Sequence, residues 1–87
     1  MSIANMKNYS GRNVVNQFVV TSKEGKMFQS YSTDIAFVPN DGSPIRLNVE
    51  WRSTSTTAKY RNQFLNTTTK QIEHGLRNGD YIIDESM

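Results

Sequence analysis

The sequence predicts a small α+β domain, with strands and helices in the order β-β-β-β-α-α-β. Apolar and polar residues alternate over residues 45–52, and glycine-containing turns stand at residues 23–26 and 40–44. Apolar residues also lie four positions apart at 60 and 64, and again at 72 and 76. The first two features are typical of a small antiparallel sheet made of two hairpins, and the third is typical of two short helices. A C-terminal strand after the helices completes the sheet.

The first twelve residues show no periodic apolar pattern and are rich in Asn, Ser and Gly. Because such a segment offers little to pack against a core, we expect residues 1–12 to form a flexible N-terminal arm that orders late or on a partner. Residues 13–87 are expected to form a single α+β domain, since a chain of 87 residues has room for one small core.

Four strands are expected before the helices. In the clearest of them, apolar residues alternate with charged or amide residues, so that one face is core and the other meets water or a partner. The apolar members of this strand are Ile45, Leu47, Val49 and Trp51. The four expected strands are residues 13–22, 27–31, 35–38 and 45–52.

The first helix is expected over residues 58–66. Tyr60 and Phe64 lie four positions apart and therefore share one helical face. Any of several hydroxyl groups in residues 53–57 can cap its amino end by accepting a backbone N–H bond.

The second helix follows the threonines at residues 67–69, which supply its cap. Ile72 and Leu76 repeat the four-residue spacing, and Gly79 supplies the stop. The apolar run at residues 81–83 is then expected to add the last strand to the sheet.

The residues available for catalysis are few. The chain has no cysteine, which excludes disulfides, thiolate metal sites and cysteine nucleophiles. Its one histidine, His74, lies away from the apolar face of its helix, and no metal-ligand spacing surrounds it. The five glycines are scattered and form no phosphate-binding loop. We therefore expect no catalytic residue, metal or cofactor, and a function in binding rather than catalysis.

No apolar run approaches the roughly 18 residues that a bilayer-spanning helix needs. The amino terminus also lacks the apolar stretch of a signal peptide. We expect a cytoplasmic protein that does not contact membranes.

Charge is distributed unevenly along the chain, although the net charge is only +2. Basic side chains gather at the end of the fourth expected strand and in the two helices, with amides between them. Such a set can meet phosphates through charge and base edges through amides, or form the polar rim of a protein interface. The candidate partner-binding residues are Arg52, Lys59, Arg61, Asn62, Gln63 and Lys70.

Two stretches carry a resemblance to a known group of proteins. They are Asn16-Gln17-Phe18-Val19-Val20, leading to Phe28-Gln29-Ser30-Tyr31, and Thr56-Thr57-Ala58-Lys59-Tyr60-Arg61-Asn62-Gln63-Phe64-Leu65, followed by Gly79-Asp80-Tyr81-Ile82. The chain resembles a family of small uncharacterised proteins encoded by tailed bacteriophages and prophages. The resemblance implies a non-enzymatic accessory protein made in an infected host cell.

Two functions are therefore expected from this sequence. The first is a phage accessory protein that binds and inhibits or redirects a host protein, such as a component of a defence system. The alternative is a nucleic-acid-binding module that uses the basic helix faces. A homodimer would offset the thin stability margin of so small a core.

Overall fold

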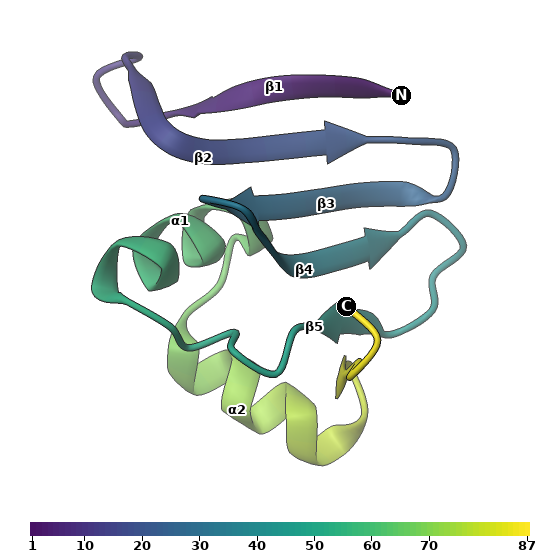
Figure 1. Cartoon of the computed structure of the whole chain (residues 1–87). Coiled ribbons are helices and arrows are strands. Elements are labelled where there is room, and N and C mark those ends of the chain that lie inside the picture. Colours follow the sequence, from purple (N-terminus) through teal and green to yellow (C-terminus); the bar gives the residue numbers. More distant parts are fainter.

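The computed structural model describes residues 1–87 as one sheet of six strands with two helices (Figure 1). The strands lie side by side in chain order, and every neighbouring pair is antiparallel except β5 and β6. Both helices fall between β5 and β6, and this long connection lets β6 run parallel to β5. The elements are β1 Ser2–Lys7, β2 Asn13–Thr21, β3 Gly25–Ser30, β4 Thr33–Pro39, β5 Ile45–Leu47, α1 Ser55–Leu65, α2 Thr69–Asn78 and β6 Tyr81–Ile83. The predicted α+β class and the order of its elements are confirmed, with one further strand at the amino end.

That further strand corrects the expected flexible arm at residues 1–12. Ser2–Lys7 forms β1, which pairs with β2 from Ser2 opposite Thr21 onward. Residues 8–12 are the connecting loop, where the Asn8 side-chain oxygen accepts hydrogen bonds from two backbone N–H groups. β1 is an edge strand and is largely exposed, so its sequence carries no apolar alternation to predict it.

The fourth predicted strand is shorter than expected. β5 ends at Leu47, and the Asn48 side-chain oxygen then accepts a hydrogen bond from the Glu50 backbone at 2.8 Å. This Asx turn leads the chain away from the sheet. Val49, expected in the core, is consequently exposed, whereas Trp51 is buried as expected but from a loop.

Both helices follow predicted capping hydroxyls, although α1 begins at Ser55, three residues before the expected start, and its end at Asn66 had no predicted stop signal. Thr54 caps α1 and Thr68 caps α2, each by accepting a backbone N–H bond in the first turn. Asn66 and Gly79 end the helices in the left-handed conformation.

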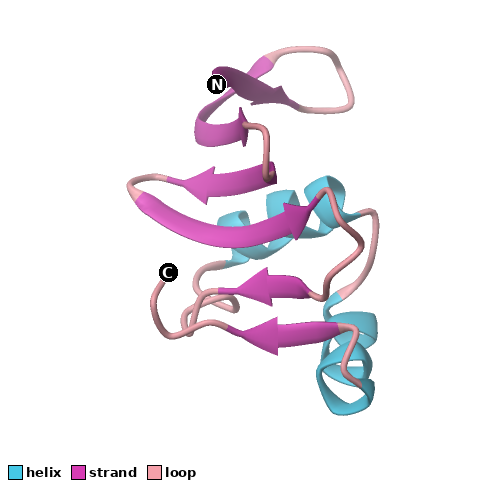
Figure 2. Ribbon diagram, turned by 90° about the vertical axis from the view of Figure 1, so that its right-hand side faces the viewer, coloured by secondary structure: helices cyan, strands magenta, loops and turns pink.

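Both helices cover the same face of the sheet (Figure 2). Phe28 of β3 stacks on Phe64 of α1, with ring centroids 5.8 Å apart, and is fully buried. Ile72 of α2 and Leu47 of β5 are also fully buried in this core. The opposite face of the sheet has no helix over it, and we refer to it as the open face.

Candidate functional site

A row of side chains crosses the open face from one edge of the sheet to the other. Phe28 faces the helices, so its neighbour Met27 faces the other side, because successive side chains in a strand alternate. Residues directly opposite each other on paired strands share a face. The strand register therefore aligns one residue from each strand: Ile3, Val20, Met27, Phe37, Arg46 and Ile82. We call these six residues the open-face row.

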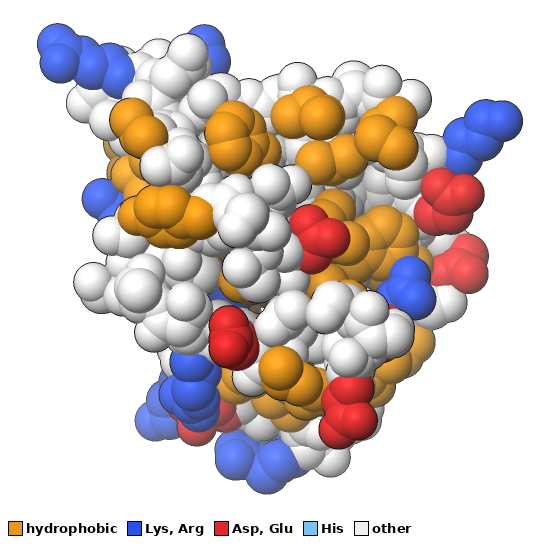
Figure 3. Space-filling view, viewed as in Figure 1, with side chains coloured by type: hydrophobic (Ala, Val, Ile, Leu, Met, Phe, Trp, Pro, Cys, Tyr) orange, Lys and Arg blue, Asp and Glu red, His pale blue; other side chains and the backbone are white.

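Five members of this row are apolar, although the face lies outside the core. Ile3 is 68% exposed and Ile82 is 42% exposed, while Val20 and Met27 are partly exposed. Figure 3 shows hydrophobic side chains in a band across this side of the molecule. The outer face of an antiparallel sheet is usually polar, so an apolar row there indicates an interaction surface.

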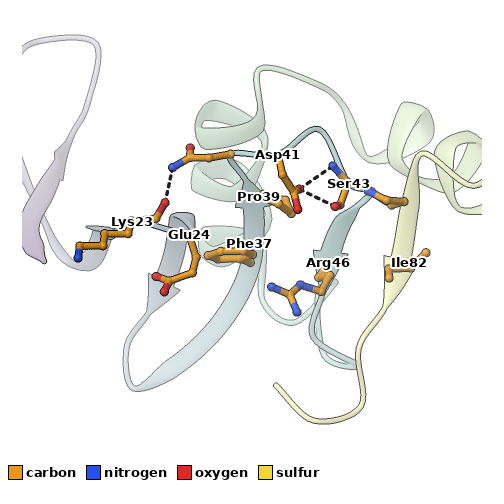
Figure 4. Close-up of a pocket in the computed structure, with 10 residues that line it drawn as sticks. Lys23, Glu24, Phe37, Pro39, Asp41, Ser43, Arg46 and Ile82 are labelled. Carbon is orange, nitrogen blue, oxygen red and sulfur yellow. Dashed lines mark hydrogen bonds between the residues drawn. The ribbon is translucent and has the colours of Figure 1, made fainter.

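A hollow of about 390 Å³ lies at one end of this surface, between the turns that follow β2 and β4 (Figure 4). Phe37, Pro39 and Ile82 provide its apolar part. Charged side chains surround them, contributed by Lys23, Glu24, Asp41 and Arg46. The hollow can therefore accept an apolar side chain at its centre and polar groups around it.

Arg46 is the one cation of the row. Its guanidinium lies over the Phe37 ring, 4.7 Å from the centroid, and its Nη1 is 3.7 Å from a carboxylate oxygen of Asp84. The Arg46 side chain is still 43% exposed. Because the ion pair is long and the group is accessible, Arg46 keeps capacity for a carboxylate of a partner.

The C-terminal residues border the same face. A second hollow, of about 330 Å³, lies between the open face and the C-terminal residues. Met27 and Phe37 line it from the sheet, and Ser86 and Met87 line it from the C-terminal turn. The chain is held here by Asp84, whose side chain accepts hydrogen bonds from the Ser86 hydroxyl and backbone N–H. These bonds, together with the charge of Arg46, lower the pKa of the Asp84 carboxyl.

Arg61, predicted to point outward to a partner, is instead fully buried. It donates to the Trp51 carbonyl oxygen at 2.7 Å and to the side-chain oxygens of Asn62 and Thr69. Its guanidinium also lies 5.0 Å from the centroid of the Trp51 ring. Burial lowers the pKa of Arg61, and the nearby charge of Arg52 lowers it further. Arg61 therefore joins the loop before α1 to the start of α2, and it does not contribute to an exposed surface.

Two other predicted site residues also have structural contacts. The Asn62 side chain is partly buried and accepts from Arg61. The Gln63 side chain donates to the Lys7 carbonyl oxygen at 2.7 Å and so fastens β1 to α1.

The three remaining predicted residues are exposed cations. Arg52 lies over the Trp51 ring at 4.7 Å and forms a 3.0 Å ion pair with Glu73 of α2. Lys59 lies on α1 and Lys70 in the first turn of α2. The six predicted residues therefore divide into three that hold the structure together and three that reach solvent.

The open-face row was missed by sequence reasoning, although one signal for it exists. Phe18, Val19 and Val20 are consecutive apolar residues in β2, which indicates a strand with apolar side chains on both faces. Which residues lie side by side in the row depends on the strand register, and the register cannot be read from the sequence.

The structure defines a small α+β protein whose six-stranded sheet is covered by helices on one face only. The chain belongs to the family described as "Family of unknown function (DUF8033)", whose model matches residues 1–81. Comparisons with curated proteins and with solved structures found no match. Neither helix is long and apolar enough to cross a membrane.

Proposed function

We propose that this chain is a non-enzymatic accessory protein that acts by covering a surface of another protein with its open face. The observation that carries the proposal is the open-face row, in which five apolar side chains and Arg46 cross the uncovered side of the sheet. Interfaces of this kind combine an apolar centre with a polar rim.

The surface offers features that favour a protein partner. The two hollows that share Phe37 and Arg46 can receive anchor side chains, and buried anchors supply most of the affinity of protein interfaces. An apolar side chain that becomes fully buried on binding contributes about 1.5–3 kcal/mol. Burial of the exposed apolar members of the row would therefore favour binding of a partner that covers them.

We further propose a phage origin for the protein and a host protein as its partner. The resemblance to small proteins of tailed bacteriophages supports an accessory protein acting in the cytoplasm of an infected host. Its target would be a host protein, such as a component of a defence system, which is inhibited or redirected when the open face occupies its surface.

The test is affinity capture from host lysate with tagged protein, with and without nuclease treatment, followed by mass spectrometry. The proposal predicts one stoichiometric host protein that survives nuclease. Loss of all captured protein on nuclease treatment would contradict it.

A second copy of the chain is the other protein that could cover the open face. Sedimentation of the purified protein across a concentration series separates the two cases, because a face that pairs with itself gives a dimer. The proposal predicts a monomer whose open face is free for the host protein.

A further inference from the structure

The charges of the molecule divide between its two sides. Residues 51–79, which comprise both helices and the loop before them, contain five of the ten Lys and Arg residues but only one of the eight Asp and Glu residues. The remaining sequence contains the other five basic residues and seven acidic ones. Arg61 is buried, so the surface of residues 51–79 carries four exposed cations and one carboxylate, whereas the rest of the molecule is slightly acidic.

Two of these exposed cations, Lys70 and Arg77, lie on the same side of α2. Lys70, His74 and Arg77 occupy positions i, i+4 and i+7, so they form one stripe along the helix, and all three are exposed. A shallow hollow of about 440 Å³ runs along the stripe. It is lined by Thr68, Lys70, Gln71, His74 and Arg77, with no hydrophobic side chain among them.

The nearest acid on the helix is already engaged. Glu73 is the only acidic residue of α2, and its carboxylate lies 3.0 Å from Arg52. Lys70 stands in the first turn, where the helix dipole disfavours a positive charge and where α2 has no acid to compensate it. The stripe is thus a positive surface that the chain itself does not neutralise.

We propose that the Lys70–His74–Arg77 stripe binds the phosphodiester backbone of a nucleic acid. Charge complementarity identifies the occupant, because the two cations Lys70 and Arg77 lie along the helix at a spacing that matches successive phosphates of one strand. Lys70 and Arg77 are separated by seven residues, or about 10 Å along the helix axis. That distance spans about three nucleotides of one strand.

The composition of the surface favours a nucleic acid over an acidic protein. The stripe lacks the apolar anchors that protein interfaces use. Thr68 and Gln71 instead add hydroxyl and amide groups, which donate to phosphate oxygens in many nucleic-acid complexes. The inference is independent of the proposed function, because the stripe and the open-face row lie on opposite sides of the sheet.

The experiment is fluorescence anisotropy with short labelled nucleic acids of mixed sequence: duplex DNA, single-stranded DNA and single-stranded RNA. Binding is measured between about 50 and 200 mM salt. The test variant is Lys70→Glu with Arg77→Glu. The matched control is Arg12→Glu with Lys26→Glu, which makes the same change in net charge at exposed positions outside both helices. Circular dichroism melting verifies that both variants fold.

The proposal predicts that the parent binds at least one nucleic acid and that affinity falls steeply with salt. The Lys70/Arg77 variant should lose about tenfold or more of the affinity at low salt, and its salt slope should shrink by about two units. The control should keep the parent's slope. Three results would overturn the proposal: no binding by the parent, equal weakening by the two variants, or binding to vesicles of anionic phospholipid in place of nucleic acid.

Discussion

The guanidinium of Arg46 lies 4.7 Å above the centre of the Phe37 ring, and the two residues stand directly opposite each other on β4 and β5. Both hollows of the open face are lined by this pair. The ring is almost wholly buried beneath its neighbours, whereas the cation remains accessible. The pair therefore places one accessible positive charge next to Ile82, near the end of the open-face row where both hollows lie.

Replacing Arg46 tests the contribution of this pair to stability. Arg46→Gln removes a cation–π contact worth about 0.5–1 kcal/mol and a long ion pair worth about 0–1 kcal/mol. We expect the free energy of unfolding to fall by about 1 kcal/mol in urea titrations, and Arg46→Lys to lose less because it keeps the charge. Equal stability of Arg46→Gln and the parent would show that the contact does not stabilise the fold.

Arg61 is expected to be among the most sensitive polar residues of the chain. Arg61→Ala leaves three buried or partly buried acceptors without their donor, each costing about 1–3 kcal/mol, although water entering the cavity recovers part of the loss. We expect a net loss of about 3 kcal/mol in chemical denaturation. Lys59→Ala, an exposed position on the same helix, is the control and should change stability by less than about 0.5 kcal/mol. Similar stabilities for the two variants would contradict the structural role of Arg61.

The C-terminal turn should weaken in acid. The pKa of Asp84 is lowered from its ordinary value of 3.8, so its ionised form is favoured by folding. The stabilisation is fully present above about pH 4 and is lost as pH falls through the lowered pKa. We therefore expect the stability difference between the parent and Asp84→Asn to be constant near neutral pH and to shrink below about pH 4, as measured by thermal melting across pH. A difference that stays constant into strong acid would be inconsistent with this assignment.

The effect of Gly75→Ala on the free energy of unfolding is expected to depend on the side chain at position 81. Ala is usually favoured over Gly inside a helix by about 1 kcal/mol. At position 75, however, a Cβ atom would overlap the ring of Tyr81. We expect Gly75→Ala to destabilise the parent by about 1–3 kcal/mol, but to stabilise a Tyr81→Ala background, where the side chain beyond Cβ is absent. Stabilisation in both backgrounds would show that α2 and β6 are not packed this closely.

The helices could be predicted because their signals are local. The capping threonines, the Tyr60 and Phe64 pair and the Gly79 stop lie within one or two turns of the structure that they determine. β1 has no such signal. It is held by pairing with β2 and by the Gln63 bond to the Lys7 carbonyl, which connects residues 56 positions apart.

The site was harder to predict for a related reason. Arg61 has the spacing of a residue at the edge of a helix, but the loop carrying Trp51 lies over it and the start of α2 lies beside it. The open-face row depends on five strand pairings, each of which moves a side chain to the other face if it shifts by one residue. Residue types alone therefore could not bring the six residues of the open-face row together.

The affinity of the open face for its captured protein partner tests the central proposal most directly. The test variant, Val20→Thr with Met27→Gln, makes the middle of the open-face row polar while retaining side chains of similar size. The control, Tyr9→Gln with Val49→Thr, makes equivalent changes at exposed positions outside the row. The account predicts that calorimetric titration of the purified partner will show a rise in Kd of about tenfold or more, equal to about 1.4 kcal/mol, for the test variant only. An unchanged Kd for the test variant, with its fold intact by circular dichroism, would contradict the claim that the open face is the binding surface.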